Sequence, residues 1–121
     1  MAKKKSKAQR NAAAVQHFNM NYGVDETKLQ GWQRLCEDVG ITPQDSVTQC
    51  KKALKTTFVN IHHLVDAKKR GEHPRRFPSR EALRNHIKQT NSWFPKKVAK
   101  ENGFLKALLI EVWGFGEGNK N

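Results

Sequence analysis

The sequence predicts an all-α fold, a compact array of about six or seven short helices with a disordered basic N-terminal arm. Apolar residues recur at spacings of three and four along most of the 121 residues. Gly and Pro interrupt these patterns at intervals of roughly ten residues, which keeps the helices short. Nothing in the chain alternates strands with helices as a parallel sheet requires. Short elements of this kind favour an orthogonal array over a bundle of long helices.

The chain is expected to divide into an arm, one helical domain and a tail. Residues 1–10 offer nothing to bury and form the predicted arm, residues 11–113 form the domain, and residues 114–121 form a flexible tail. The cations of the arm are Lys3, Lys4, Lys5, Lys7 and Arg10. Helical composition begins at about Ala8, and Gly23 is the predicted stop of this first helix.

Two further helices are predicted in the first half of the chain. Asp25 is the expected N-cap of the second helix, which Gly40 ends. Its apolar positions have a clear helical period: Leu29, Trp32, Leu35, Cys36 and Val39. Thr42-Pro43 is expected to start the third helix, because Pro suits a first helical turn. Its inward side is predicted to hold Val47, Cys50, Ala53 and Leu54.

The segment 56–61 is ambiguous, because its β-branched residues also suit a short strand. No partner strand is predicted elsewhere, so we interpret it as a helix entry or connector into a helix over Ile61–Lys69. Gly71 ends that helix, and residues 71–78 form a loop with two prolines.

Three helices are predicted in the remainder. Ser79 caps the first, which turns Ala82, Leu83 and Ile87 inward. Pro95 begins a short helix that ends at Asn102-Gly103. The segment Phe104–Trp113 is the most apolar and is expected to be the buried central helix.

The net charge of +12 is unevenly placed. Residues 1–24 carry +5, residues 25–66 carry −1, residues 67–100 carry +9 and residues 101–121 carry −1. Two basic blocks separated by a near-neutral one indicate a binding face and a tail. The sequence thus predicts a neutral helical scaffold that presents one ordered charged face.

The predicted face consists of eleven cations: Lys68, Lys69, Arg70, Arg75, Arg76, Arg80, Arg84, Lys88, Lys96, Lys97 and Lys100. Three of them, Arg80, Arg84 and Lys88, recur every four residues and line one side of a predicted helix, which suits contacts with successive phosphates. Aromatic residues are interleaved with the cations: Phe77, His86, Trp93 and Phe94. Phe77, Trp93 and Phe94 flank prolines and are more typical of a core than of base stacking.

Candidate catalytic and metal-binding groups are sparse. His62 and His63 are neighbours, so they diverge on a helix and we expect one surface and one partly buried residue. The zinc spacings Cys-x-x-Cys and His-x-x-x-His are absent from the sequence. Cys36 and Cys50 lie on apolar stripes and are expected to be buried, reduced thiols. We therefore expect no enzyme activity, no metal and no cofactor.

Localisation is predicted from the same composition. No apolar run reaches the roughly 18 residues of a membrane span. The N-terminus has no apolar segment of a signal peptide, which favours an intracellular protein. The lysines of the arm are typical of a nuclear localisation patch, so a nuclear location is predicted.

The chain resembles a family of uncharacterised helical proteins from filamentous ascomycete fungi. The resemblance covers about three-quarters of the chain. The residues that carry it are Phe18-Asn19, Tyr22-Gly23, Gly31-Trp32-Gln33-Arg34-Leu35-Cys36, Gly40-Ile41, Cys50-Lys51-Lys52-Ala53, Val59-Asn60-Ile61, Leu64-Val65-Asp66, Phe94-Pro95-Lys96-Lys97, Ala99-Lys100 and Gly103-Phe104-Leu105-Lys106-Ala107-Leu108-Leu109. It implies a compact helical unit and assigns no activity.

Together these observations predict a non-enzymatic basic protein that associates with nucleic acid through residues 67–100. The alternative is a protein-interaction module whose basic face docks an acidic partner; an anionic membrane is a weaker version of it. DNA and RNA, duplex and single strand, and the oligomeric state all stay open at this point.

Overall fold

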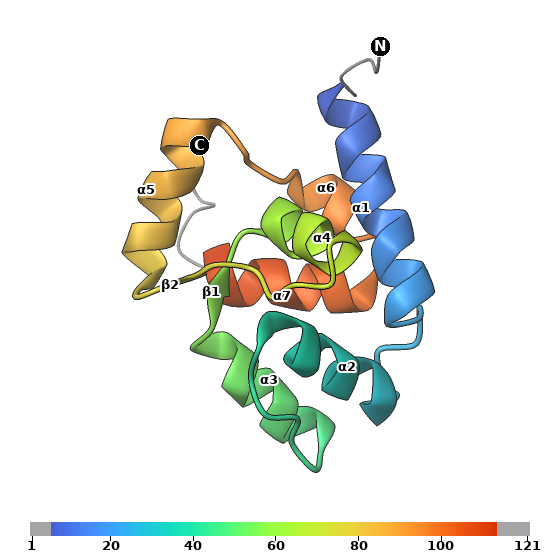
Figure 1. The fold of residues 1–121 in the computed structure, drawn as a ribbon. Helices are drawn as coiled ribbons and strands as arrows, with labels where there is room; N and C mark the ends of the chain where they lie inside the picture. The colour runs from blue at the N-terminus through green and yellow to red at the C-terminus, as the bar shows by residue number, and fades with distance from the viewer. Residues whose placement is uncertain (1–5, 114–121) are drawn as a thin grey trace.

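The computed structural model describes residues 6–113, and nearly all of its regular structure is helical (Figure 1). The helices are α1 (Lys7–Asn21), α2 (Leu29–Val39), α3 (Val47–Lys55), α4 (Ile61–Lys69), α5 (Arg80–Thr90), α6 (Lys96–Ala99) and α7 (Gly103–Trp113). Two short strands, β1 (Phe58–Val59) and β2 (Arg76–Phe77), complete the fold. The predicted all-α array of six or seven short helices is confirmed, with one small sheet added.

Helix α7 lies at the centre of the array and packs against α1, α3, α5 and α6. Its Phe104, Leu105, Leu108 and Leu109 are at most 5% exposed, which confirms that the most apolar segment is buried. Buried residues from all seven described helices join one core. Helices α1 and α5 stand on opposite sides of it, and α2 and α3 lie together at one end (Figure 1).

The N-terminal helix begins earlier than the sequence predicts. Ser6 and Gln9 form a reciprocal capping box, in which each side chain accepts a hydrogen bond from the other residue's backbone N–H. This cap starts α1 at Lys7, so the last four residues of the predicted arm are helical. Lys3, Lys4, Lys5 and the predicted tail 114–121 lie outside the described residues.

The expected N-cap at Asp25 is wrong. Its carboxylate accepts hydrogen bonds from the backbone N–H and the hydroxyl of Thr27, at 2.9 and 2.5 Å, and so closes a local turn instead. Helix α2 begins four residues later, at Leu29, without a side-chain cap.

The expected start of the third helix at Thr42-Pro43 is also wrong. The Ser46 hydroxyl accepts a hydrogen bond from the backbone N–H of Gln49 at 3.1 Å, and α3 therefore begins at Val47. Cys50 and Leu54 are buried as predicted.

The strand alternative for segment 56–61 proves correct in part. Phe58 pairs with Phe77 and Val59 with Arg76 in an antiparallel ladder. The partner strand lies inside the predicted loop 71–78, where two residues carry too little pattern to be recognised. Asn60 follows β1 and accepts a hydrogen bond from the backbone N–H of His62 at 2.9 Å, which caps α4. The predicted range of α4 is confirmed.

The start of α7 depends on a buried asparagine that the sequence assigns to the end of the preceding helix. Asn102 is 2% exposed, and its Oδ1 accepts hydrogen bonds from the backbone N–H groups of Phe104 and Leu105. Its Nδ2 donates to Asn19 Oδ1 at 2.6 Å and to the carbonyl of Gly23 at 3.0 Å. One side chain therefore caps α7 and ties it to the C-terminal end of α1.

Gly31 allows α2 to approach its neighbours closely. A Cβ at this position would lie 2.5 Å from the backbone carbonyl of Tyr22 and would overlap the ring of Phe104. The next residue, Trp32, packs its ring against Phe104 with 4.7 Å between centroids and donates from Nε1 to the Glu26 carbonyl at 2.8 Å. Packing thus explains why glycine stands here.

Candidate nucleic-acid interface

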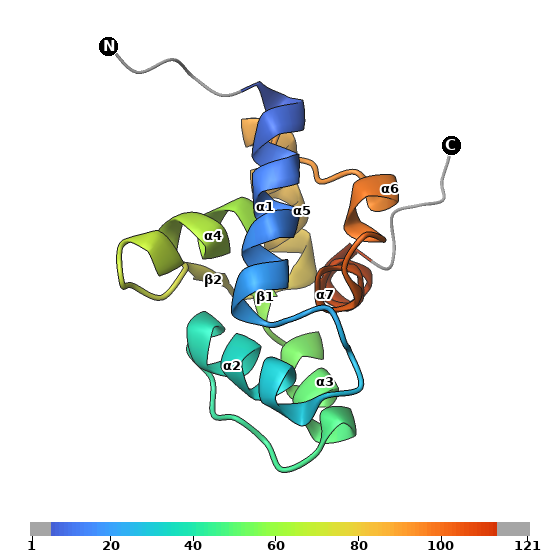
Figure 2. The ribbon, with the colours of Figure 1, turned by 90° about the vertical axis from the view of Figure 1, so that its right-hand side faces the viewer.

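The basic segment 67–100 does not form one face. Its cations lie in three places: from the end of α4 to Arg76 in β2, along α5, and on and beside α6. Helices α4 and α6 lie on opposite sides of α1 in Figure 2. Lys96, Lys97 and Lys100 are therefore separated from the cations of α4, and the prediction of a single ordered face over these residues is wrong.

The cations of α5 are also unequal. Arg84 and Lys88 are exposed, whereas Arg80 is half-buried. Of the three cations that recur every four residues along α5, only two are therefore well exposed to solvent.

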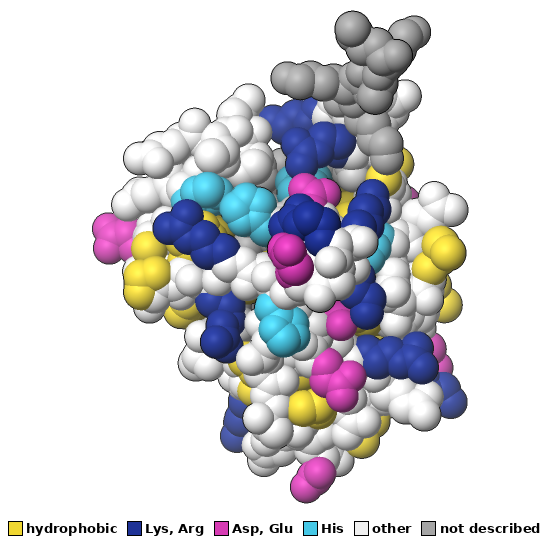
Figure 3. Space-filling view, in the orientation of Figure 1, with side chains coloured by type: hydrophobic (Ala, Val, Ile, Leu, Met, Phe, Trp, Pro, Cys, Tyr) yellow, Lys and Arg dark blue, Asp and Glu magenta, His cyan; other side chains and the backbone are white. Residues whose placement is uncertain are grey.

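The fold instead brings cations of α1 next to those of α4. Arg10 and Lys69 line the same pocket between these helices. Lys and Arg side chains gather over this part of the molecule in Figure 3, with carboxylates and imidazoles between them. We call this surface the α1–α4 face and define it by Lys7, Arg10, Lys68, Lys69 and Arg75.

Histidines on these helices show how closely the cations converge. Burial, together with repulsion from Arg10 and Lys7, lowers the pKa of His62 to about 4, although Asp66 opposes the shift. Burial, the neighbouring His86, Arg75 and Arg10 lower the pKa of His63. Arg10 of α1 thus acts on both histidines of α4, and Arg75 from the connection to β2 acts on His63.

On the other side of the face, burial is the main cause that lowers the pKa of His17, and Lys69 and Lys68 add to it. All three histidines are therefore held neutral at neutral pH. The positive charge of the face comes from its lysines and arginines.

The two adjacent histidines have different environments, but the expectation that one of them lies at the surface is wrong. His62 is 6% exposed and lies 5.5 Å from the ring of Phe94, whereas His63 is half-buried and lies 5.0 Å from the ring of His86. Within residues 6–109 no group of three or more His, Cys, Asp or Glu side chains is arranged to hold a metal ion.

Carboxylates neutralise part of the α1–α4 face. Lys68 Nζ lies 3.1 Å from Asp38 Oδ1, and next to the face Arg70 Nε lies 3.1 Å from Glu72 Oε1. The Arg70 pair is more than half exposed and contributes little to stability. Arg75 instead stacks over the ring of Phe77 at 4.5 Å.

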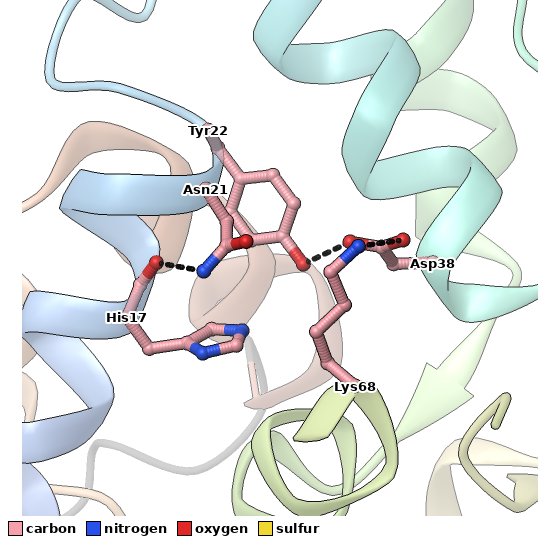
Figure 4. A network of polar contacts seen from close by, with 5 residues as sticks. All are labelled: His17, Asn21, Tyr22, Asp38 and Lys68. Carbon is pink, nitrogen blue, oxygen red and sulfur yellow. Dashed lines mark hydrogen bonds and ion pairs between the residues drawn. The ribbon is translucent and has the colours of Figure 1, made fainter. Parts of the chain in front are cut away.

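A polar network fixes the geometry between α1, α2 and α4 (Figure 4). The Tyr22 hydroxyl donates a hydrogen bond to Asp38 Oδ2 at 2.8 Å, and Lys68 Nζ donates to Asp38 Oδ1. Burial and the nearby Asp38 carboxylate raise the pKa of Tyr22, so its phenol stays protonated and keeps donating. This network joins the end of α1 to α2 and α4 and so holds the two helices of the α1–α4 face in place relative to each other.

The aromatics of the basic segment are mostly core residues. Phe77 and Phe94 are 7% and 6% exposed, which confirms the prediction for both. Trp93 is 40% exposed, so the same prediction is wrong for it. Trp93 and Phe94 are neighbours in the connection between α5 and α6, and only Phe94 turns into the core.

Cys36 and Cys50 are both free thiols and fully buried, which confirms their expected place on the apolar stripes. Burial and the adjacent Cys50 raise the pKa of Cys36 to about 12. A thiol in this environment stays protonated at neutral pH and is a poor nucleophile.

The described helices include none long and apolar enough to cross a membrane. No protein-family model, curated protein or solved structure matches the chain. The resemblance to the fungal family therefore stays a prediction.

Proposed function

We propose that this chain is a non-enzymatic protein that binds nucleic acid through the α1–α4 face. The observation that carries the proposal is that Arg10 of α1 and Lys69 of α4 line one pocket together with the neutral His62. Arg75, from the connection to β2, adds a third cation, which is one of the charges that lower the pKa of His63. Among the described residues these three cations have no carboxylate partner within 4.0 Å. Nucleic-acid phosphates would supply the missing negative charge.

The other basic elements contribute in a different way. In this proposal the lysines of residues 1–5 extend the electrostatic reach of the face, because only the N-cap Ser6 separates them in sequence from Lys7 of α1. The cations of α6 lie on the other side of α1 and take no direct part. A nuclear location, which the lysine run predicts, belongs to the same proposal.

Two charge-reversal variants test which surface binds. One carries Arg10→Glu, Lys69→Glu and Arg75→Glu; its matched control carries Lys96→Glu, Lys97→Glu and Lys100→Glu. Both variants change the net charge by the same amount, so a general attraction to polyanions would weaken equally in both. Circular dichroism and thermal unfolding verify that each variant folds.

The measurement is the fluorescence anisotropy of a labelled 20-nucleotide single strand, titrated at several salt concentrations. The face variant should bind at least tenfold more weakly, and its log–log salt slope should be smaller by about 2, at about 0.7 for each lost phosphate contact. The control variant should change less than threefold at 0.1 M salt, where the screening length is about 10 Å. Equal losses in both variants, or no binding by the native chain at about 50 mM salt, would overturn the proposal.

The runner-up function, docking of an acidic protein, is one outcome of this experiment. A labelled polyglutamate peptide is titrated in the same way: if the native chain binds it in a salt-dependent manner and does not bind the single strand, and the face variant loses that binding, the same face serves a protein partner.

A further inference from the structure

A small pocket opens on the α1–α4 face, between α1 and α4. Its volume is about 70 Å³, and its lining consists of Arg10, Ala13, His62, Val65, Asp66 and Lys69. At about 10–15 Å³ for each water-sized group, the pocket admits about five such groups. It therefore holds one phosphate, with the edge of the adjoining sugar at its open rim, and it is too small for a nucleobase.

The chemistry of the lining is mixed in a way that simple phosphate binding does not require. Arg10 and Lys69 are donors only, whereas the carboxylate of Asp66 is an acceptor only. A phosphate bound by the two cations would be repelled by that carboxylate. A ligand that suits the whole pocket must bring a hydrogen-bond donor to Asp66 next to the anion that meets Arg10 and Lys69.

His62 and the apolar wall of the pocket further restrict the class of ligand that fits. The imidazole is 6% exposed yet lines the pocket, and in its neutral form it offers one donor and one acceptor. Ala13 and Val65 present carbon surfaces that suit the ring of a sugar. A ribonucleotide has this combination, because its 2′-hydroxyl lies close to the phosphates of the same strand.

We propose that this pocket takes the ribose-phosphate backbone of single-stranded RNA, with a phosphate on Arg10 and Lys69 and a 2′-hydroxyl donating to Asp66. The inference rests on the proposed function, because it assumes that the α1–α4 face meets nucleic acid. DNA lacks the 2′-hydroxyl, so its phosphates would meet the Asp66 carboxylate without a compensating hydrogen bond. The protein therefore prefers RNA to DNA of the same sequence.

Three labelled 12-nucleotide strands of one mixed sequence test this preference. The first is RNA, the second is DNA with uracil in place of thymine, and the third is RNA with 2′-O-methyl groups. The methylated strand keeps the sugar oxygen and loses the donor. The native chain should bind the RNA at least fivefold more tightly than either of the other strands, as anisotropy titrations would measure.

Asp66→Ala gives the decisive comparison, with Glu72→Ala as its matched control. Both variants remove one exposed carboxylate from the same stretch of chain. Asp66→Ala should strengthen DNA binding, because the repulsion is lost, and should bring the RNA-to-DNA ratio close to one. Glu72→Ala should change the affinity for both strands by a similar factor and leave the ratio as it is in the native chain.

The outcomes separate this inference from the function on which it rests. Equal affinity of the native chain for all three strands, or a preference for RNA that persists in Asp66→Ala, would overturn the pocket assignment and leave nucleic-acid binding intact. Failure to bind any of the strands at about 50 mM salt would overturn both.

Discussion

His62 is a buried histidine whose surroundings oppose its protonation. Its ring lies against Phe94, and Arg10 and Lys7 are the cations that act on it, while Asp66 acts in the opposite direction. Because burial is the main cause that lowers its pKa, His62 is a neutral polar residue at the edge of the hydrophobic core. Its titration therefore affects the stability of the fold as well as the charge of the face.

We predict that the protein loses stability on mild acidification, and that His62 causes much of the loss. An unfolded histidine titrates near 6.5 and the folded His62 near 4, so between these values only the unfolded chain binds the proton. The free energy of unfolding should be nearly independent of this group well above pH 6.5 and should fall by about 1 kcal/mol per pH unit between pH 6 and 5, below the limit of about 1.4 kcal/mol for one proton. Urea unfolding at pH 7, 6 and 5 measures the slope.

His62→Phe isolates this contribution, because it keeps a ring against Phe94 and removes the titration. The slope of the variant below pH 6 should be smaller by about 1 kcal/mol per pH unit. The remaining slope comes in part from His17 and His63, whose pKa values are also lowered. An unchanged slope in the variant would show that His62 is protonated in the folded state.

At the scale of the helices, the interiors could be predicted and several of the ends could not. Helical periodicity is a local property, and for α4 and α7 it places the element within one residue. A start is predicted correctly where one good cap directly precedes the pattern, as Ser79 does for α5. The start predicted at Thr42-Pro43 is wrong, because the hydroxyl that caps α3 belongs to Ser46, three residues further on.

Asn102 is the clearest case of an end that tertiary contacts decide. Its side chain is satisfied on one side by α7 and on the other by Asn19 and Gly23, which lie about eighty residues earlier in the chain. No pattern around residue 102 reveals these partners, and the local sequence alone predicts that the residue ends the preceding helix.

We predict that Asn102→Ala destabilises the protein by about 2–4 kcal/mol. The variant loses the cap of α7, which is worth about 0.5–2 kcal/mol, and leaves buried polar partners without a hydrogen bond at about 1–3 kcal/mol. Ser79→Ala is the matched control, because it removes an exposed cap and should cost about 1 kcal/mol. Chemical denaturation of the two variants makes the comparison, and equal losses would show that the links to α1 contribute nothing.

At the scale of the molecule, the fold decides which cations lie close together in space, and their order in the sequence does not. The basic and near-neutral blocks can be identified from the sequence, because counting charges along the chain does not require a structure. The sequence cannot show that Lys69 and Arg10 line one pocket while α6 lies across α1, because that depends on how the helices pack. The sequence therefore predicts that the candidate site is basic, but it predicts only some of the residues that form the site.

The lysines of residues 1–5 give a last prediction at this scale. Changing Lys3, Lys4 and Lys5 to Ser should weaken binding to a single strand and reduce the log–log salt slope by about 2, at about 0.7 for each phosphate contact. The stability should not change, because the Ser6–Gln9 capping box starts α1 without them. Thermal unfolding and salt-dependent anisotropy measure the two effects separately.

The matched control replaces Lys96, Lys97 and Lys100 with Ser and so removes the same three positive charges. Since these residues belong to the other side of α1, their loss should reduce the slope by less than 1. If both variants reduce the slope equally, the net charge of the molecule governs binding and the position of the lysines does not matter. If only the N-terminal variant reduces it, the lysines of residues 1–5 and the α1–α4 face act on the same strand.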